Sequence, residues 1–272
     1  MNKGAYTAII VEGANREMQV LENFVKINFK SAERYKIIYF PAEQNIYMLW
    51  KIMHRDNFET DIIEIVREYS EQARKIVSGL SRKDFSDVFL FFDYDGHQNN
   101  LEKDKNGDKI LLQMLETFDN ETENGKLYIS YPMVEAVRDF IPNKCNVFTN
   151  CICYLKNIVY YKKRSANGNP NIDIKSYTFQ EWREIINVFA MRVSCLFNKN
   201  RVVKFEEYRE EISSLTIYEK QNEYIEKGQI FILSAFPEFL LDYYRKDFWN
   251  SNIKFSVFQI EQQQICCGKK RK

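Results

Sequence analysis

The strongest constraint on the fold is the segment 88–95, which reads Val-Phe-Leu-Phe-Phe-Asp-Tyr-Asp. Its five consecutive apolar residues predict a strand that is buried on both faces, as in the middle of a parallel sheet. Because strand side chains alternate, Asp93 and Asp95 are expected to point to the same side at the carboxyl end of this strand. Open α/β sheets bind their ligands at that edge.

Two carboxylates at this spacing repel each other, and a bound cation would relieve the repulsion. Carboxylate oxygens are hard ligands, which suit Mg²⁺ or Mn²⁺. Asp93 and Asp95 are therefore predicted metal ligands. The alternative is an ordinary surface turn, because Asp-rich loops after strands are common.

A second apolar strand is predicted over Tyr6–Val11, and it too is followed by an acid, in Glu12-Gly13. Asn15 is suited to cap the helix that apolar residues at helical spacing predict next. Glu12 is therefore expected at the same edge of the sheet. Gly13 in the tight turn would let backbone amides approach a ligand.

Further strands are predicted over 35–40 and 126–131, and helices over 45–53, 62–80 and 110–118. Pro132 suits the first turn of a helix, which is expected over 133–140. Glu135 then lies at the amino end of this helix, near a third strand end. It is either an additional site acid or a residue that stabilises the helix dipole.

These elements predict an α/β fold in which a mostly parallel sheet is flanked by helices, formed by residues 1–140. Residues 141–272 are expected to form a mostly helical region packed on the first. Thr178 and Glu181 make a capping box before a long helix, and further helices are predicted over 208–224 and 236–244. The apolar segment 230–233 fits either a strand or a helix start.

Lys and Arg number 39 and Asp and Glu number 38, so the overall charge neither predicts nor excludes a polyanionic partner. Locally, Lys162, Lys163 and Arg164 follow two tyrosines. Positive charge beside aromatic rings suits a phosphate backbone and its bases, so these three are predicted to bind nucleic acid. A solvated loop is the alternative for so short a run.

The six cysteines lack the spacing of zinc knuckles, and the two histidines are not near them in sequence. Free thiols in a reducing compartment are expected. The amino terminus runs into a strand rather than a signal peptide, and no apolar run approaches the length of about 18 residues of a membrane span. The predicted location is the cytoplasm, without membrane contact.

The combination of Glu12-Gly13 after the first strand with Asp93-Tyr-Asp95 after a later one resembles the Toprim domain, found in topoisomerases, bacterial primases and OLD-type nucleases. The resemblance implies a Toprim-like Rossmannoid sheet, Glu12 as general acid/base or metal ligand, and Asp93 and Asp95 as Mg²⁺ ligands. OLD-type members carry a second acid about one helical turn after the first. Here the corresponding acid, Glu17, departs from that spacing. Residues 131–135 resemble a motif of Toprim-like defence proteins, which adds Glu135.

The chain has no phosphate-binding Gly-x-x-x-x-Gly-Lys-Ser/Thr loop. OLD-type nucleases often fuse an ABC-type ATPase to Toprim, while PARIS-type phage-defence systems keep the Toprim subunit separate. The chain is similar to such a stand-alone effector, which implies a separate ABC-type ATPase that restrains or activates it. Whether it forms a homodimer is left open.

The predicted function is metal-dependent hydrolysis of phosphodiester bonds in DNA or RNA, tRNA included, by the toxic effector of an anti-phage defence system. The nearest enzyme alternative is a haloacid-dehalogenase-like phosphatase, because Asp93-Tyr-Asp95-Gly96 also resembles the nucleophile motif of that family. That family's motif usually lies near the amino terminus, and it leaves Glu12-Gly13 unexplained. A different class is a non-catalytic Toprim-fold module that binds or regulates a partner.

Overall fold

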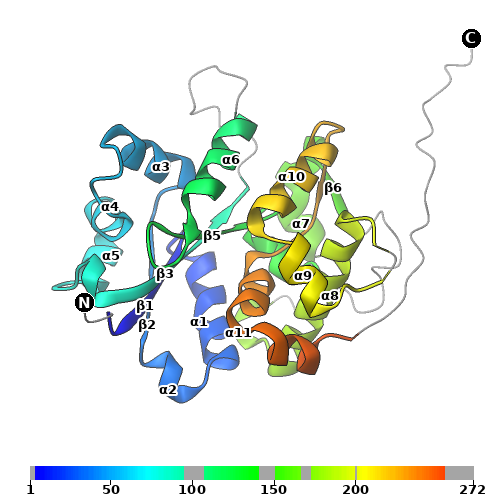
Figure 1. Ribbon diagram of the computed structural model, residues 1–272, viewed down its shortest axis with the longest axis horizontal. Helices are drawn as coiled ribbons and strands as arrows, with labels where there is room; N and C mark the ends of the chain where they lie inside the picture. Colours follow the sequence, from blue (N-terminus) through cyan, green and yellow to red (C-terminus); the bar gives the residue numbers. More distant parts are fainter. Residues whose placement is uncertain (1–3, 95–106, 141–150, 167–172, 200, 255–272) are drawn as a thin grey trace, which may run out of the picture.

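The computed structural model of the protein describes residues 4–94, 107–140, 151–166, 173–199 and 201–254 (Figure 1). Asp95 lies outside the described residues, as do Cys145, Cys266 and Cys267. The described cysteines, Cys151, Cys153 and Cys195, form no disulfide with one another.

A five-stranded sheet forms the centre of the molecule, with strand order β2-β1-β3-β5-β4. The neighbouring pairs among the first four strands are parallel, and only the two-residue strand β4 is antiparallel. This confirms the predicted α/β class with a mostly parallel sheet. The strands are β1 (Tyr6–Val11), β2 (Ile37–Pro41), β3 (Phe85–Asp93), β4 (Asp119–Asn120) and β5 (Gly125–Ser130).

The central position of β3 explains its unbroken apolar run, because it has strand neighbours on both edges and helices over both faces. Figure 1 shows α3, α4 and α5 on one side of the sheet, and α1 and α11 on the other. The helices of the first half are α1 (Arg16–Asn28), α2 (Ser31–Arg34), α3 (Ile46–Arg55), α4 (Ile62–Tyr69), α5 (Glu71–Ile76) and α6 (Gly107–Thr117), with the 3₁₀ helix η1 (Arg82–Asp84).

The single helix expected over 62–80 is wrong, because the chain breaks at Ser70 into α4 and α5. Ser70 is fully buried and extended, with φ −111° and ψ 116°. Its hydroxyl accepts from the Ala73 amide at 3.0 Å and donates to Glu43 Oε2 at 2.7 Å. A serine that caps a new helix thus interrupts a periodicity that continues past it.

The helix expected over 133–140 is also wrong in kind and start. The chain stays extended beyond β5, because the Tyr131 amide donates to the Leu233 carbonyl at 2.7 Å and Leu233 donates back at 3.0 Å. The Tyr131–Pro132 peptide bond is cis, and Met133 is extended. A short 3₁₀ helix, η2 (Val134–Arg138), follows.

The second half is mostly helical, as expected. The capping box is confirmed: the Thr178 amide donates to Glu181 Oε2 at 2.7 Å, and α8 follows. The helix expected over 208–224 is two helices, because Ile212 and Ser213 are both extended. The described elements of the second half are β6 (Ile152–Tyr154), η4 (Leu155–Tyr160), α7 (Tyr161–Ala166), η5 (Ile174–Ser176), α8 (Phe179–Leu196), α9 (Phe205–Glu211), α10 (Ser214–Ile225), β7 (Gln229–Phe231) and α11 (Ala235–Asn252).

Helix α11 covers the sheet beside α1 and so shares the core of the first half (Figure 1). The Phe239 ring lies 4.8 Å from that of Phe89 on β3, and the Phe236 ring 5.1 Å from that of Phe91, centroid to centroid. The Phe24 ring of α1 lies 5.1 Å from Phe236. In the part of the chain that the structure describes, no helix is long and apolar enough to cross a membrane.

Candidate functional site

The strand order places the reversal of the chain between β1 and β3. From β1 the chain continues to β2 on one side, and β3 and β5 lie on the other. Ligands of open α/β sheets bind at such a switch point, beyond the carboxyl ends of the strands. Glu12 directly follows β1 and Asp93 ends β3, so two of the predicted acids stand at this point. The Asp93 amide donates to Glu12 Oε2 at 3.2 Å.

Glu17, in the first turn of α1, belongs to the same site. Its carboxylate lies over Gly13: a Cβ atom built on Gly13 would stand only 2.5 Å from Glu17 Oε2. Glycine at this position therefore leaves room for the carboxylate. The negative charge of Glu17 is one of the causes that raise the pKa of Asp93, so Glu17 is grouped with Glu12 and Asp93.

Glu135 reaches the same place from η2. Its side chain is 2% exposed, and Oε2 has no hydrogen-bond partner among the residues that the structure describes. Oε1 lies 3.7 Å from Lys162 Nζ. A buried carboxylate oxygen without a donor is unusual, because it loses its hydration without replacement. We call Glu12, Glu17, Asp93 and Glu135 the acid site.

The electrostatics of Asp93 follow from this crowding. Burial raises the pKa of Asp93 well above its ordinary value, and the charges of Glu12, Glu17 and Glu135 raise it further. A hydrogen bond from the backbone amide of Val134 lowers the pKa without reversing the shift. Burial and the neighbouring carboxylates therefore outweigh this hydrogen bond at Asp93, and a cation would stabilise the ionised form of Asp93.

The described residues include no group of three or more His, Cys, Asp or Glu side chains arranged to hold a metal ion. Asp95, the other predicted ligand, is not among them. The chemistry of the donor set nevertheless fits a hard cation: it consists of carboxylate oxygens, and none of the described residues donates to Glu135 Oε2. Mg²⁺ needs only one or two protein carboxylates, since water completes its octahedral shell.

The three predicted nucleic-acid-binding residues lie on α7 rather than in a loop, and the structure separates their surroundings. Lys162 is 71% exposed at its side chain, and its ammonium pairs with Glu135. Lys163 is exposed. Arg164 is half-buried and hydrogen-bonds to the Cys153 side chain. Of the three, Lys162 alone is paired with a member of the acid site.

Two neighbours of Glu135 hold α7 in place. Arg138, 6% exposed, donates from Nε to Ser165 Oγ at 2.9 Å and from Nη2 to the Lys162 carbonyl. Asp139 accepts from the Tyr161 hydroxyl at 3.0 Å. The helix that carries Lys162 is therefore attached to the segment that carries Glu135 on both sides of Lys162.

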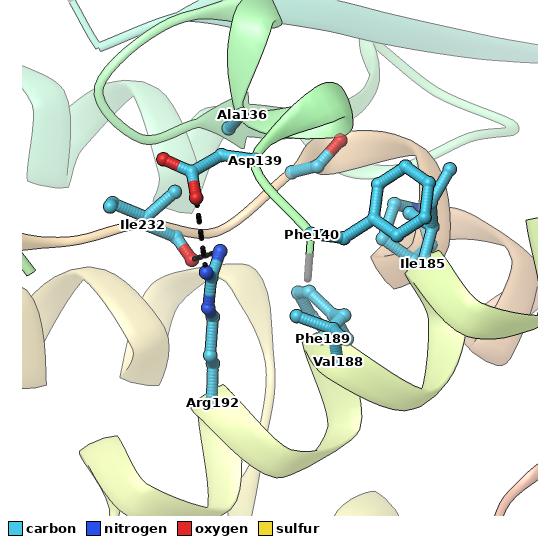
Figure 2. Close-up of a pocket in the computed structure, with 10 residues that line it drawn as sticks. Ala136, Asp139, Phe140, Ile185, Val188, Phe189, Arg192 and Ile232 are labelled. Carbon is cyan, nitrogen blue, oxygen red and sulfur yellow. Dashed lines mark hydrogen bonds and ion pairs between the residues drawn. The ribbon is translucent and has the colours of Figure 1, made fainter. Parts of the chain in front are cut away.

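Asp139 is itself held by Arg192 of α8, whose Nη2 lies 3.3 Å from Asp139 Oδ1 (Figure 2). Arg192 Nη1 also donates to the Ile232 carbonyl at 3.2 Å. A cavity beside this ion pair measures about 10 Å³, room for about one water molecule. The cavity is too small to hold a substrate, so we do not count it as part of the acid site. Sequence reasoning missed these residues, because their partners are distant in the chain and no local pattern marks them.

Comparison of the chain with family models, with curated proteins and with solved structures finds no match in any of the three.

Proposed function

We propose that the protein is a metal-dependent nuclease with a Toprim-like site. The observation that carries the proposal is that Glu12 and Asp93, joined by a hydrogen bond, stand with Glu17 at the switch point of a parallel sheet, where the charge of Glu135 also acts on Asp93. Carboxylates gathered at this edge suit the binding of a divalent cation and a phosphate ester. The Toprim motifs at Glu12-Gly13 and Asp93-Tyr-Asp95 point to the same chemistry from the sequence.

Asp93, Glu12 and Asp95 would hold Mg²⁺ or Mn²⁺, with Glu17 and Glu135 beside them. When bound, such an ion neutralises phosphate charge and makes water a better nucleophile. In the hydrolysis, the water oxygen bonds to phosphorus, the bond from phosphorus to the leaving sugar oxygen breaks, and a proton passes from the water to that oxygen. Glu12 is the residue we assign to that proton transfer. The ammonium of Lys162, next to Glu135, would offset phosphate charge.

The biological setting that we infer is a cytoplasmic effector in anti-phage defence. Its support is the resemblance of the Glu12-Gly13 and Asp93-Tyr-Asp95 motifs to those of stand-alone Toprim subunits. An ABC-type ATPase that restrains or activates the effector is the partner that this resemblance implies.

The test is incubation of the purified protein with plasmid DNA and with total RNA, in Mg²⁺ or Mn²⁺ and in a chelator. We expect metal-dependent cleavage of one substrate that is lost in Glu12→Gln and in Asp93→Asn. The matched control is Glu68→Gln, an exposed acid on α4 that should cleave like the wild type.

Wild-type cleavage by Glu12→Gln would contradict the proposed role of this residue. Turnover of a simple phosphomonoester without cleavage of either polymer would favour the phosphatase. Binding without turnover under every condition, including addition of a cognate ATPase, would favour the non-catalytic module.

A further inference from the structure

The segment 154–166, which we call the η4–α7 ledge, exposes large apolar side chains. Val159 is 74% exposed, Tyr160 68% and Tyr154 43%. Exposed aromatic and aliphatic side chains gathered within one short segment indicate a contact surface rather than a core. Figure 1 shows α7 and β6, which mark the position of the ledge, on the side of the molecule opposite α3, α4 and α5.

The charge of the ledge has one sign. Its sequence contains no Asp or Glu, in a chain whose overall charge is only +1, and it contains the cations Lys156, Lys162, Lys163 and Arg164. Lys156 Nζ lies 5.8 Å from the centre of the Tyr154 ring. Lysines that flank exposed rings offer phosphate contacts and stacking surfaces together.

The ledge is also attached to the acid site. Lys162 pairs with Glu135, and Arg138 and Asp139 hold the backbone and side chains of α7. A polyanion lying on the ledge would therefore reach the acid site through Lys162.

We propose that the η4–α7 ledge binds a single-stranded stretch of nucleic acid, with Tyr160 and Tyr154 stacking on unpaired bases and Lys156, Lys162 and Lys163 contacting phosphates. The inference rests on the proposed nuclease function in one respect: the strand is expected to run from the ledge to the acid site. A fully paired duplex hides the faces of its bases, so it cannot use the exposed rings. A ledge without acidic groups suits a polyanion.

The test measures binding in a chelator, so that no cleavage is required. Fluorescence anisotropy is recorded with labelled single-stranded RNA, single-stranded DNA and a duplex of the same sequence. We expect the wild type to prefer one of the single strands to the duplex. Tyr160→Ala should weaken that binding roughly tenfold, the effect of losing one stacked base. Tyr160→Trp should retain it.

Tyr160→Ala and a second test variant, Lys163→Ala, each have a matched control variant. Tyr35, 85% exposed, lies between α2 and β2, and Tyr35→Ala should bind like the wild type. Lys163→Ala should reduce the slope of log affinity against log salt by about 0.7, as expected for one lost phosphate contact on a single strand. Lys83→Ala, at an exposed lysine of η1, should leave the slope unchanged.

The proposal is overturned if the wild type binds no single strand, or if Tyr160→Ala binds as the wild type does. Binding with these mutational effects but without cleavage in metal would reject the nuclease function and keep the binding surface. Cleavage that Tyr160→Ala leaves intact, with unchanged binding, would do the reverse.

Discussion

Asp93 is a residue whose buried charge should reduce the stability of the fold. Burial and the neighbouring carboxylates raise its pKa well above the ordinary value. An acid with a raised pKa in the folded state stabilises the fold fully only below its unfolded pKa, about 3.9. That contribution is lost as pH rises through the folded pKa. Near pH 8 without metal, Asp93 should therefore cost the protein stability.

We expect Asp93→Asn to raise the melting temperature at pH 8 in a chelator, because the amide carries no charge and still accepts from Val134. A gain of about 1 kcal/mol corresponds to roughly 2–4 °C in a protein of this size class. Mg²⁺ should then raise the melting temperature of the wild type and leave the variant unchanged. Thermal unfolding with and without Mg²⁺ measures both effects. A lower melting temperature for Asp93→Asn in the chelator would show that the acid site is not strained by its charges.

The sequence predicted that Glu12, Asp93 and Glu135 lie at one edge of the sheet because each follows or ends a predicted strand, which is a local signal. It did not anticipate that Lys162 pairs with Glu135, since the two are far apart in the chain and meet only after folding. Glu17 was placed outside the expected spacing, although the turn at Gly13 brings its carboxylate back over the site. Contacts of this kind depend on tertiary packing, which periodicity does not describe.

At the scale of elements, hydrophobic periodicity located the four parallel strands well, but it missed β4 and β6 and the breaks between helices. The breaks at Ser70 and at Ile212–Ser213 depend on extended backbone and hydroxyl caps. Two residues of the apolar stripe expected over 62–80, Tyr69 and Ile76, are 45% and 38% exposed. A pattern that satisfies one long helix can also be satisfied by two short ones that turn different faces to the core.

Asp139, which accepts a hydrogen bond from Tyr161 of α7, also forms a buried ion pair with Arg192 of α8. The two side chains of this pair are 13% and 5% exposed. Asp139→Asn should lower the free energy of unfolding by roughly 3–5 kcal/mol, because it leaves the Arg192 charge buried without its counter-charge. The double variant Asp139→Asn, Arg192→Met should recover much of the loss, since both charges leave together. Urea unfolding measures the three proteins.

Glu71→Gln, which removes one partner of the exposed pair with Lys75, serves as the control and should change little. Equal stability of Asp139→Asn and the wild type would show that the Asp139–Arg192 pair contributes little to the free energy of unfolding.

At the scale of the whole molecule, the helical second half and the sheet share one polar cluster as well as one core. Asp242 of α11 accepts from the Tyr128 hydroxyl of β5 at 2.8 Å and pairs with Lys126 and Arg209. The sequence predicted the apolar stripes of these helices but not the face of the sheet that α11 covers. That choice depends on which aromatic rings meet, and a stripe alone does not identify its partner.

Glu238, one turn before Asp242, gives this arrangement a pH dependence. It is 3% exposed, and its Oε1 accepts from Ser214 Oγ of α10 at 2.6 Å. Burial raises the pKa of Glu238 to about 8. Because the folded value is raised, its stabilising contribution is complete below the unfolded pKa of about 4.3 and is lost as pH rises to about 8.

We therefore expect wild-type stability to fall between about pH 5 and pH 8 by roughly 1 kcal/mol per pH unit more than that of Glu238→Gln. The amide oxygen can still accept from Ser214, so the difference isolates the buried charge. Chemical unfolding at several pH values measures it, with Glu219→Gln, an exposed acid of α10, as the matched control. Parallel curves for the wild type and Glu238→Gln would mean that Glu238 ionises in the folded protein as it does in the unfolded chain. Diverging curves would show that the contact between the second half and the sheet excludes water from the Glu238 carboxylate. The packing of α11 on the sheet would then weaken as the pH becomes alkaline.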